Sequence, residues 1–105
     1  IVERAHEIGC KVGLYNHGGW FGQPQNLLRL VERLPPGQVG IVYNLHHGHD
    51  HIDDLADHLR AMLPHLMTVN LNGMKTQGDR IGQKILPIGE GDRDLEILQT
   101  IAESG

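Results

Sequence analysis

Cysteine is almost missing from this chain, with Cys10 standing alone among 105 residues. A single cysteine excludes an internal disulfide, and its isolation is typical of proteins kept in a reducing compartment. We therefore expect a cytoplasmic protein. Because the sequence begins at Ile1 rather than at a methionine, the absence of a signal peptide says nothing about export.

Aromatic residues, basic runs and long apolar stretches are also scarce. Phe, Trp and Tyr make up 4% of the residues, too few for the stacking surfaces of proteins that bind single-stranded nucleic acid. The formal net charge is −4 and Lys and Arg form no cluster, so neither nucleic acid nor an anionic membrane is an expected partner. No apolar run reaches the length needed to span a bilayer.

Short apolar runs alternate regularly with segments whose apolar residues recur at helical spacing. Such alternation predicts parallel strands joined by right-handed helical crossovers. The predicted elements are a helix end at 1–8, a strand at 11–16, a helix at 24–34, a strand at 39–45, a helix from Asp50 or Asp53 to Leu63, a strand at 66–71 and a helix at 94–103. Between them, 18–22 is predicted to be a flexible glycine-rich turn and 73–84 a polar loop.

Three parallel strands with helices on one side form neither a closed barrel nor a wide sheet. Parallel strands are normally covered on both faces and have neighbours at both edges. We therefore predict the α/β class and, within it, a partial (β/α)8 TIM barrel, since no G-x-G-x-x-G motif of a dinucleotide-binding fold follows any strand. Four side chains are expected to face the uncovered side of the sheet: Val12, Leu14, Val42 and Val69.

Asparagine stands at the carboxyl end of each predicted strand, as Asn16, Asn44 and Asn70. His17 follows the first of these and Asn72 lies two residues beyond the third. Because the carboxyl ends of parallel strands converge, we expect one shared pocket at this end of the sheet. Amide groups hold the hydroxyl and carbonyl groups of a polyol well, but they are poor as the main ligands of a hard divalent cation.

Four histidines follow the second predicted strand, as His46, His47, His49 and His51, with Asp50 among them. Neutral imidazoles and a carboxylate can bind zinc, manganese or iron. The nearest named pattern is the H-x-H-x-D-H motif of the metallo-β-lactamase hydrolases, but here Asp50 comes one residue early. We expect His46 or His47 in the pocket, and His49 and His51 in a solvated loop and helix start.

Two loops carry further candidates. Glu90, inside the glycine-rich segment 89–92, is a candidate general acid or base. Backbone N–H groups of the same segment could receive an anion, although the Lys and Ser or Thr of a phosphate-binding loop are missing. Trp20 and Phe21, inside the glycine-rich turn, are expected either to wall the pocket or simply to pack against the protein.

The serial order of these segments resembles the xylose-isomerase-like TIM-barrel superfamily of sugar phosphate isomerases and epimerases, which also holds the endonuclease-IV-like proteins. The resembling segments are, in order, VGLYNHGG, QPQNLLRLVERL, VGIVYNLHHGH, LMTVNLNGM and ILPIGEGDRDLEILQTIAESG. On this resemblance, residues 1–105 are a fragment of a single barrel domain that contains its strands five to seven.

Sugar isomerases of this superfamily typically hold one divalent ion, such as Mn, Mg or Zn, which polarises the substrate carbonyl. The resemblance places three usual ligands, a Glu, an Asp and a His, at Tyr15, Asn44 and Asn70, so these ligands are not retained. It places the family's substrate-facing histidine at His47. A relocated metal site would use His17 and His47.

Three functions are open at this point. We favour an enzyme, a sugar or hydroxy-carbonyl isomerase or epimerase, with His47 and Glu90 as catalytic residues. Its substrate-binding residues would be the polar side chains at the strand ends: Asn16, His17, Asn44, His46, Asn70 and Asn72. The alternatives are a metal-free carbohydrate-binding barrel and a metal-dependent hydrolase that uses the histidine cluster. The expected partners are a small-molecule carbohydrate, the rest of the same barrel and a second copy in a homo-oligomer.

Overall fold

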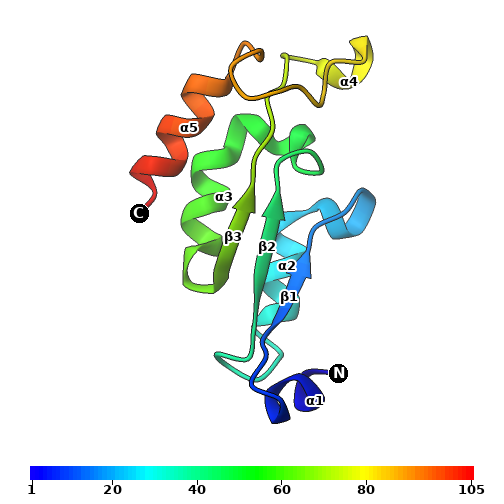
Figure 1. The fold of residues 1–105 in the computed structure, drawn as a ribbon, viewed down its shortest axis with the longest axis vertical. Coiled ribbons are helices and arrows are strands. Elements are labelled where there is room, and N and C mark those ends of the chain that lie inside the picture. Colours follow the sequence, from blue (N-terminus) through cyan, green and yellow to red (C-terminus); the bar gives the residue numbers. More distant parts are fainter.

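The computed structural model describes all residues, 1–105, and forms one layer of strands with helices packed against one of its faces (Figure 1). The helices and strands are, in chain order, α1 (Val2–Glu7), β1 (Val12–Tyr15), the 3-10 helix η1 (Gly19–Gly22), α2 (Pro24–Val31), β2 (Val39–Asn44), the 3-10 helix η2 (His49–Asp54), α3 (Leu55–Met62), the 3-10 helix η3 (Leu63–His65), β3 (Leu66–Asn70), α4 (Gly78–Ile81) and α5 (Asp94–Glu103). The predicted order of strands and helices is therefore confirmed.

The sheet has the order β1-β2-β3, and both strand pairs are parallel. Val12 of β1 lies opposite Val39 of β2, and Asn44 at the end of β2 lies opposite Asn70 at the end of β3. The register shifts by one residue between Ile41 and Val42 of β2, which leaves one extra residue in β3. The crossovers run through α2 and α3, as the alternating pattern predicted.

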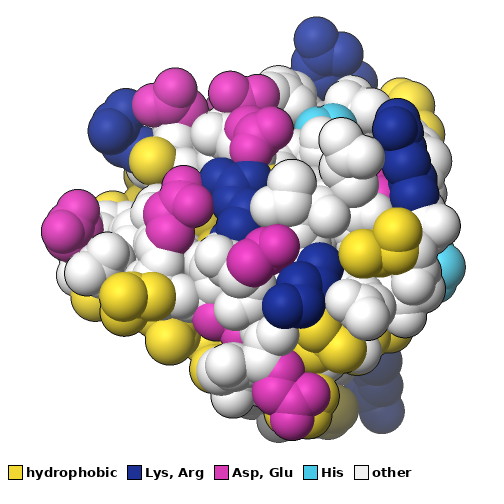
Figure 2. Space-filling model, turned by 90° about the horizontal axis from the view of Figure 1, so that it is seen from above, with side chains coloured by type: hydrophobic (Ala, Val, Ile, Leu, Met, Phe, Trp, Pro, Cys, Tyr) yellow, Lys and Arg dark blue, Asp and Glu magenta, His cyan; other side chains and the backbone are white.

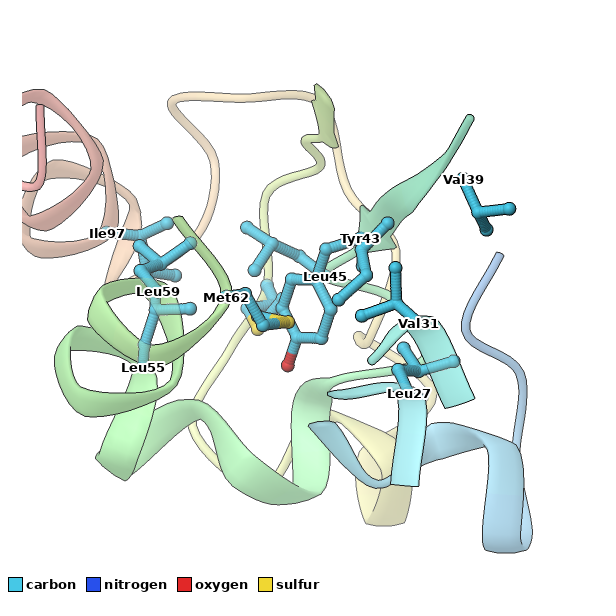
Figure 3. Packing of buried hydrophobic residues seen from close by; sticks show 11 residues of the cluster. Leu27, Val31, Val39, Tyr43, Leu45, Leu55, Leu59, Met62 and Ile97 are labelled. Atoms are coloured by element: carbon cyan, nitrogen blue, oxygen red, sulfur yellow. The ribbon is translucent and has the colours of Figure 1, made fainter. Parts of the chain in front are cut away.

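The hydrophobic core lies between β2 and the helices α2 and α3. Ile41 and Tyr43 of β2, and Leu45 just after it, are fully buried. Figure 3 shows side chains of α2 and α3 beside Tyr43. α5 contributes Ile97 to the core cluster, and α2 and α3 contribute Leu27, Val31, Leu55, Leu59 and Met62. Their three- and four-residue spacing puts them on one stripe of each helix, which explains why the amphipathic segments fold against the sheet.

The opposite face of the sheet is not covered by any helix (Figure 1). Two glycines, Gly13 and Gly40, lie on this face at positions that have no room for a side chain. A Cβ at Gly40 would lie 2.8 Å from the carbonyl oxygen of His65, and one at Gly13 would lie 2.7 Å from the side chain of Val42. Tyr15 and Met67 on this face are 41% and 47% exposed. In a closed barrel this face is the barrel interior.

The prediction that four apolar side chains face the uncovered side was wrong for three of them. Val12, Leu14 and Val69 pack against the helix-covered core instead, and only Val42 lies on the uncovered face. The strands alternate between faces with a period of two, so the three residues follow Ile41 and Tyr43 onto the helix side.

Several local predictions also need correction. The segment 18–22, predicted to be a flexible turn, contains η1, and the predicted loop 73–84 contains the short helix α4. The helix predicted to begin at Asp50 or Asp53 begins only at Leu55, after η2 and without a side-chain cap. The carboxylate of Asp53 instead pairs with Arg93. None of the helices is both long and apolar enough to cross a membrane.

Leu59 provides a direct test of the core. Replacing this fully buried residue with Ala should lower the free energy of unfolding by about 2–5 kcal/mol, because it leaves a cavity between α3 and β2. The measurement is urea denaturation of the full-length protein. The matched control, Leu95→Ala, removes a side chain that is 71% exposed and should change stability by less than about 0.5 kcal/mol. Equal losses from the two variants would contradict the assignment of the core.

Candidate functional site

The three strands end side by side at one edge of the sheet, as predicted from their terminal asparagines. β1 ends at Tyr15, and Asn44 and Asn70 are register partners at the ends of β2 and β3. The loops that follow the strands all leave from this edge (Figure 1). In parallel α/β folds this is the edge at which ligands bind.

Asn16 is fully buried and forms a clamp between the ends of β1 and β2. Its Oδ1 accepts a hydrogen bond from the backbone N–H of Asn44 at 2.6 Å, and its Nδ2 donates to the backbone carbonyl of Asn44 at 2.9 Å. These two bonds continue the β-ladder by one step through a side chain. Asn16, predicted to bind substrate, therefore has no exposed surface for a ligand and instead positions β1 against β2.

Asn44 uses its own side chain to shape the turn that carries the histidines. Its Oδ1 accepts from the backbone N–H of His46 at 2.8 Å, an Asx-type turn. Its Nδ2 donates to the hydroxyl of Tyr15 on the neighbouring strand. The amide of Asn44 thus fixes the direction in which the chain leaves β2 and the position of the Tyr15 hydroxyl.

Three histidines and Tyr15 form an aromatic cluster at this edge of the sheet, here called the imidazole cluster. The rings of His17 and His47 stack with centroids 4.3 Å apart, and His46 lies 4.5 Å from His47. Tyr15 meets the ring of His47 edge-on at 5.9 Å. Two of the loops thus contribute to one group of side chains, which confirms that His46 and His47 lie at the strand ends.

Burial and the neighbouring groups lower the pKa of two members of this cluster, His46 and His47. Burial lowers the pKa of His47, and the neighbouring His17, His46 and Lys84 lower it further. Burial also lowers the pKa of His46, with Lys84 and His17 adding to the effect. His17 accepts a hydrogen bond at Nδ1 from the N–H of Gly18, which leaves its ring proton on Nε2 in the neutral form. His46 and His47 are therefore neutral imidazoles near pH 7.

Gly48 allows the histidine turn to pass close to the core, although sequence reasoning gave it no role. A side chain at this position would collide with the hydroxyl of the fully buried Tyr43. Burial raises the pKa of Tyr43 to about 12, so that its hydroxyl stays protonated. Only glycine at 48 lets the chain turn above Tyr43 and bring His46 and His47 over the sheet end.

The remaining histidines of the run lie elsewhere, and the prediction that both are solvated was wrong. His49 is only 8% exposed, with its Nε2 3.3 Å from the carbonyl oxygen of Lys75 and its Nδ1 4.0 Å from Asp79. His51 is half-buried and meets the ring of His58 edge-on at 5.8 Å. Consecutive histidines on this curved segment therefore face different neighbours and do not converge.

The two asparagines near the end of β3 differ in what they contact. Asn70 is exposed, and its side-chain amide makes no hydrogen bond within the protein. The Nδ2 of Asn72 donates to the carbonyl oxygens of Gly73 and Lys84, at 2.8 and 2.9 Å. Asn70 can therefore meet a ligand, whereas Asn72 ties down the loop that contains α4.

Glu90 is exposed, and no hydrogen bond or ion pair joins it to the imidazole cluster. Its loop is held by Asp94, a residue that the sequence did not single out. The carboxylate of Asp94 accepts hydrogen bonds from the backbone N–H groups of Gly89, Gly91 and Met74, at 2.8, 2.9 and 3.1 Å. Glu90 thus sits on a well-anchored loop, and its catalytic role stays a prediction.

A divalent ion does not fit these residues as they lie. No group of three or more His, Cys, Asp or Glu side chains is placed to hold a metal. Two imidazoles share an ion when their in-plane lone pairs converge about 2.0–2.1 Å from each nitrogen. The rings of His17 and His47 are stacked with planes inclined by only 26°, so their lone pairs lie in nearly parallel planes and do not converge on one point. The amides of Asn44 and Asn70 supply no charge to compensate.

The end of the molecule beyond the strands is strongly polar. Figure 2 shows Lys and Arg side chains mixed with Asp and Glu across it. A groove of about 360 Å³ lies there between η2 and the loop before α4, with His49, Lys75, Asp79 and Arg93 among its lining residues. The imidazole cluster does not line this groove, so the two features are separate.

Comparisons with known proteins support the fold. No family model matches the chain, and none of the curated proteins matches it. Among solved structures, it is similar to one described as "Crystal structure of D-tagatose 3-epimerase-like protein", with a TM-score of 0.73 and 24% sequence identity. The match covers 98% of this chain and 40% of the other, so the chain spans less than half of that protein's length. The fold is therefore that of part of a TIM barrel.

Asp94 gives a pH-dependent test of the loop that carries Glu90. Burial alone would raise the pKa of Asp94, but the N–H groups of Gly89, Gly91 and Met74 outweigh it and hold the pKa below its ordinary value. The ionised carboxylate therefore stabilises the fold above about pH 4, and this contribution disappears as the pH falls through the lowered pKa. Asp94→Asn should cost about 1–3 kcal/mol of unfolding free energy at pH 7, measured by urea denaturation.

The cost of Asp94→Asn should shrink steadily below about pH 4, where the parent carboxylate also becomes neutral. The control is Asp54→Asn, an exposed position whose side chain makes no hydrogen bond. This variant should leave the free energy of unfolding unchanged both at pH 7 and below about pH 4. A cost of Asp94→Asn that does not depend on pH would rule out the charged anchor.

Proposed function

We propose that this chain is part of a xylose-isomerase-like barrel that acts on a sugar or related hydroxy-carbonyl compound by moving a proton between neighbouring carbons. The observation that carries the proposal is the imidazole cluster, with His17, His46 and His47 packed together at the carboxyl ends of parallel strands. The likeness in fold to a D-tagatose 3-epimerase-like protein supports the same class of reaction.

A neutral imidazole suits this chemistry, because it can accept a proton at one nitrogen while it donates from the other. In the proposed step, a ring nitrogen of His47 takes the proton from the carbon next to the substrate carbonyl. The electron pair of that C–H bond becomes a carbon–carbon double bond, and the carbonyl oxygen gains negative charge. The Tyr15 hydroxyl and the His46 ring are the neighbouring groups that can donate a hydrogen bond to this oxygen.

Return of the proton to the former carbonyl carbon gives an isomer, while the hydroxyl proton of the adjacent carbon moves to the negatively charged oxygen. Protonation of the original carbon on its opposite face by a second group, with the charge returning to the carbonyl, gives an epimer. The exposed amide of Asn70 is free to hold a substrate hydroxyl. No step is assigned to a metal, because the stacked imidazoles and amides do not form a ligand set for one. Glu90 is kept as a second candidate proton carrier on its anchored loop.

A metal-free carbohydrate-binding barrel is the second candidate function. It is favoured by the absence of any carboxylate in the imidazole cluster, since the strand ends offer only amide, phenol and imidazole groups. The metal-dependent hydrolase finds no such support. His47 stacks on His17, His49 faces Lys75 and His51 faces His58, so the alternate histidines do not share one ion.

The uncovered face of the sheet fits the proposal that the rest of the same barrel closes over it. Tyr15 and Met67 are apolar groups that would otherwise remain in water. A homo-oligomer is compatible with this arrangement. The partner that the reaction requires is a small-molecule carbohydrate.

The test of the proposed function is the exchange of a carbon-bound proton with solvent. D-Tagatose in heavy water, incubated with the full-length protein, should take up deuterium next to its carbonyl group, as measured by NMR. His47→Ala should slow this uptake by about 10²-fold or more, because it removes the proton acceptor. His51→Ala, in which the lost ring faces His58, should leave the rate nearly unchanged. The thermal midpoint of both variants checks that they fold.

The pH profile of this exchange gives a further expectation. Because burial and the neighbouring His17, His46 and Lys84 lower the pKa of His47, its neutral form persists below the ordinary value of about 6.5. The exchange rate should therefore remain high at pH 6.5 and fall only at more acidic pH. Unchanged exchange in His47→Ala would remove the proposed role. Saccharide binding without exchange in any variant would favour the binding barrel.

A further inference from the structure

We infer that Trp20 and Phe21 form an aromatic subsite that stacks against a sugar ring joined to the reacting sugar, so that the substrate is a glycoside or oligosaccharide. This inference rests on the proposed function, because it assigns a second binding position beside the imidazole cluster.

The first observation is the exposure of the two largest apolar side chains of the glycine-rich segment. Trp20 is 55% exposed and Phe21 is 43% exposed. Their rings meet edge-on, with centroids 5.5 Å apart and planes at 70°. Neither residue belongs to the hydrophobic core, so packing within this part of the protein does not explain them.

The second observation is that the backbone under these rings is firmly held. The carbonyl oxygen of Trp20 accepts from the backbone N–H of Gln23 at 3.3 Å and from the Nδ2 of Asn26 at 2.9 Å. Asn26 is only 9% exposed, so this side-chain bond lies largely out of water. The N–H of His17 donates to the carbonyl oxygen of Phe21 at 3.2 Å. Ordered backbone with exposed rings is the arrangement that a preformed binding surface needs.

The third observation is that this segment is continuous with the imidazole cluster. Gly22 is buried between the two histidine loops, because a Cβ there would lie 2.6 Å from the carbonyl oxygen of His17 and 3.5 Å from that of His47. A bulkier residue would push η1 away from the cluster. Trp20 and Phe21 are therefore carried by a segment that packs directly against the backbone of the imidazole cluster.

Aromatic faces carry partial negative charge, and the C–H groups on one face of a pyranose ring carry partial positive charge. A closed sugar ring offers such a flat face. The open-chain form that undergoes proton transfer does not. The position of this segment beside the imidazole cluster thus suits a ring outside the reacting unit, while His47 faces the reacting carbons.

Trp20 is the only tryptophan of the 105 residues, and its emission reports on the subsite directly. In the full-length protein, the signal of Trp20 is the difference between the parent and Trp20→Phe. Titration with lactulose, a disaccharide with a ketose unit, should change this signal. D-Fructose, its ketose unit alone, should bind about tenfold more weakly than lactulose.

Trp20→Ala should weaken lactulose binding about tenfold, measured by calorimetry, and leave fructose binding unchanged. Trp20→Phe should restore most of the affinity for lactulose, because it keeps an aromatic face. The matched control is Ile85→Ala, which trims another exposed apolar side chain, 62% exposed, on a different loop. This variant should bind both sugars like the parent.

Three results would overturn the inference. The first is equal affinities for lactulose and fructose in the parent protein. The second is an equal loss of affinity for the two sugars in Trp20→Ala. The third is Trp20 emission that acrylamide does not quench. The last would mean that another part of the chain or a second copy covers the ring. None of these readouts requires turnover. Lactulose binding at Trp20 without deuterium exchange would therefore contradict the proposed function alone. Deuterium exchange without any change in Trp20 emission on adding lactulose would contradict only this subsite.

Discussion

The double hydrogen bond between the Asn16 side chain and the backbone of Asn44 is the constraint on which the site depends. It joins the ends of β1 and β2 in a place where no backbone partner is available. Because it lies out of water, its loss would leave two backbone groups of Asn44 without partners, at a cost of about 1–3 kcal/mol each. Through Asn44 it also fixes the Tyr15 hydroxyl and the turn into His46. The clamp therefore connects sheet formation to the geometry of the imidazole cluster.

The cluster differs in kind from the carboxylate–metal centre that the resemblance implies. Phenol, amide and imidazole groups stand together, and burial and mutual proximity lower the pKa of His46 and His47. Such a site offers protons and hydrogen bonds without a fixed charge. Such groups suit proton transfer next to a carbonyl group or the binding of hydroxyl groups, which is the basis of the two proposed functions.

Much of the architecture follows from the sequence. The alternation of apolar runs and helical spacing gave the three parallel strands and their order, and the terminal asparagines located the shared edge. The sequence did not indicate which face of the sheet Val12, Leu14 and Val69 occupy, because apolar side chains are expected on either face. Gly13 and Gly40 were the missed signal, since a strand face that carries glycine has little side chain to bury against helices.

The site was predicted less completely, because its contacts join distant parts of the chain. Asn16 has the residue type of a ligand-binding group, and only the backbone of β2 shows that it is a clamp. The role of Asp94 depends on three N–H groups in two other segments. His49 and His51 follow His47 at regular spacing, but the 3-10 turn sends each ring to a different neighbour. Spacing along the sequence therefore located the imidazole cluster, but it did not show which histidines belong to it or what each one contacts.

The central claim is that these strand ends handle a proton without a divalent metal. The most direct measurement is deuterium uptake by D-tagatose before and after the full-length protein is treated with a chelator, with its metal content determined by elemental analysis. The account predicts that uptake continues at the same rate when the divalent metal content has fallen far below one ion per chain. Loss of uptake on chelation and its recovery on adding Mn²⁺ or Zn²⁺ would contradict it.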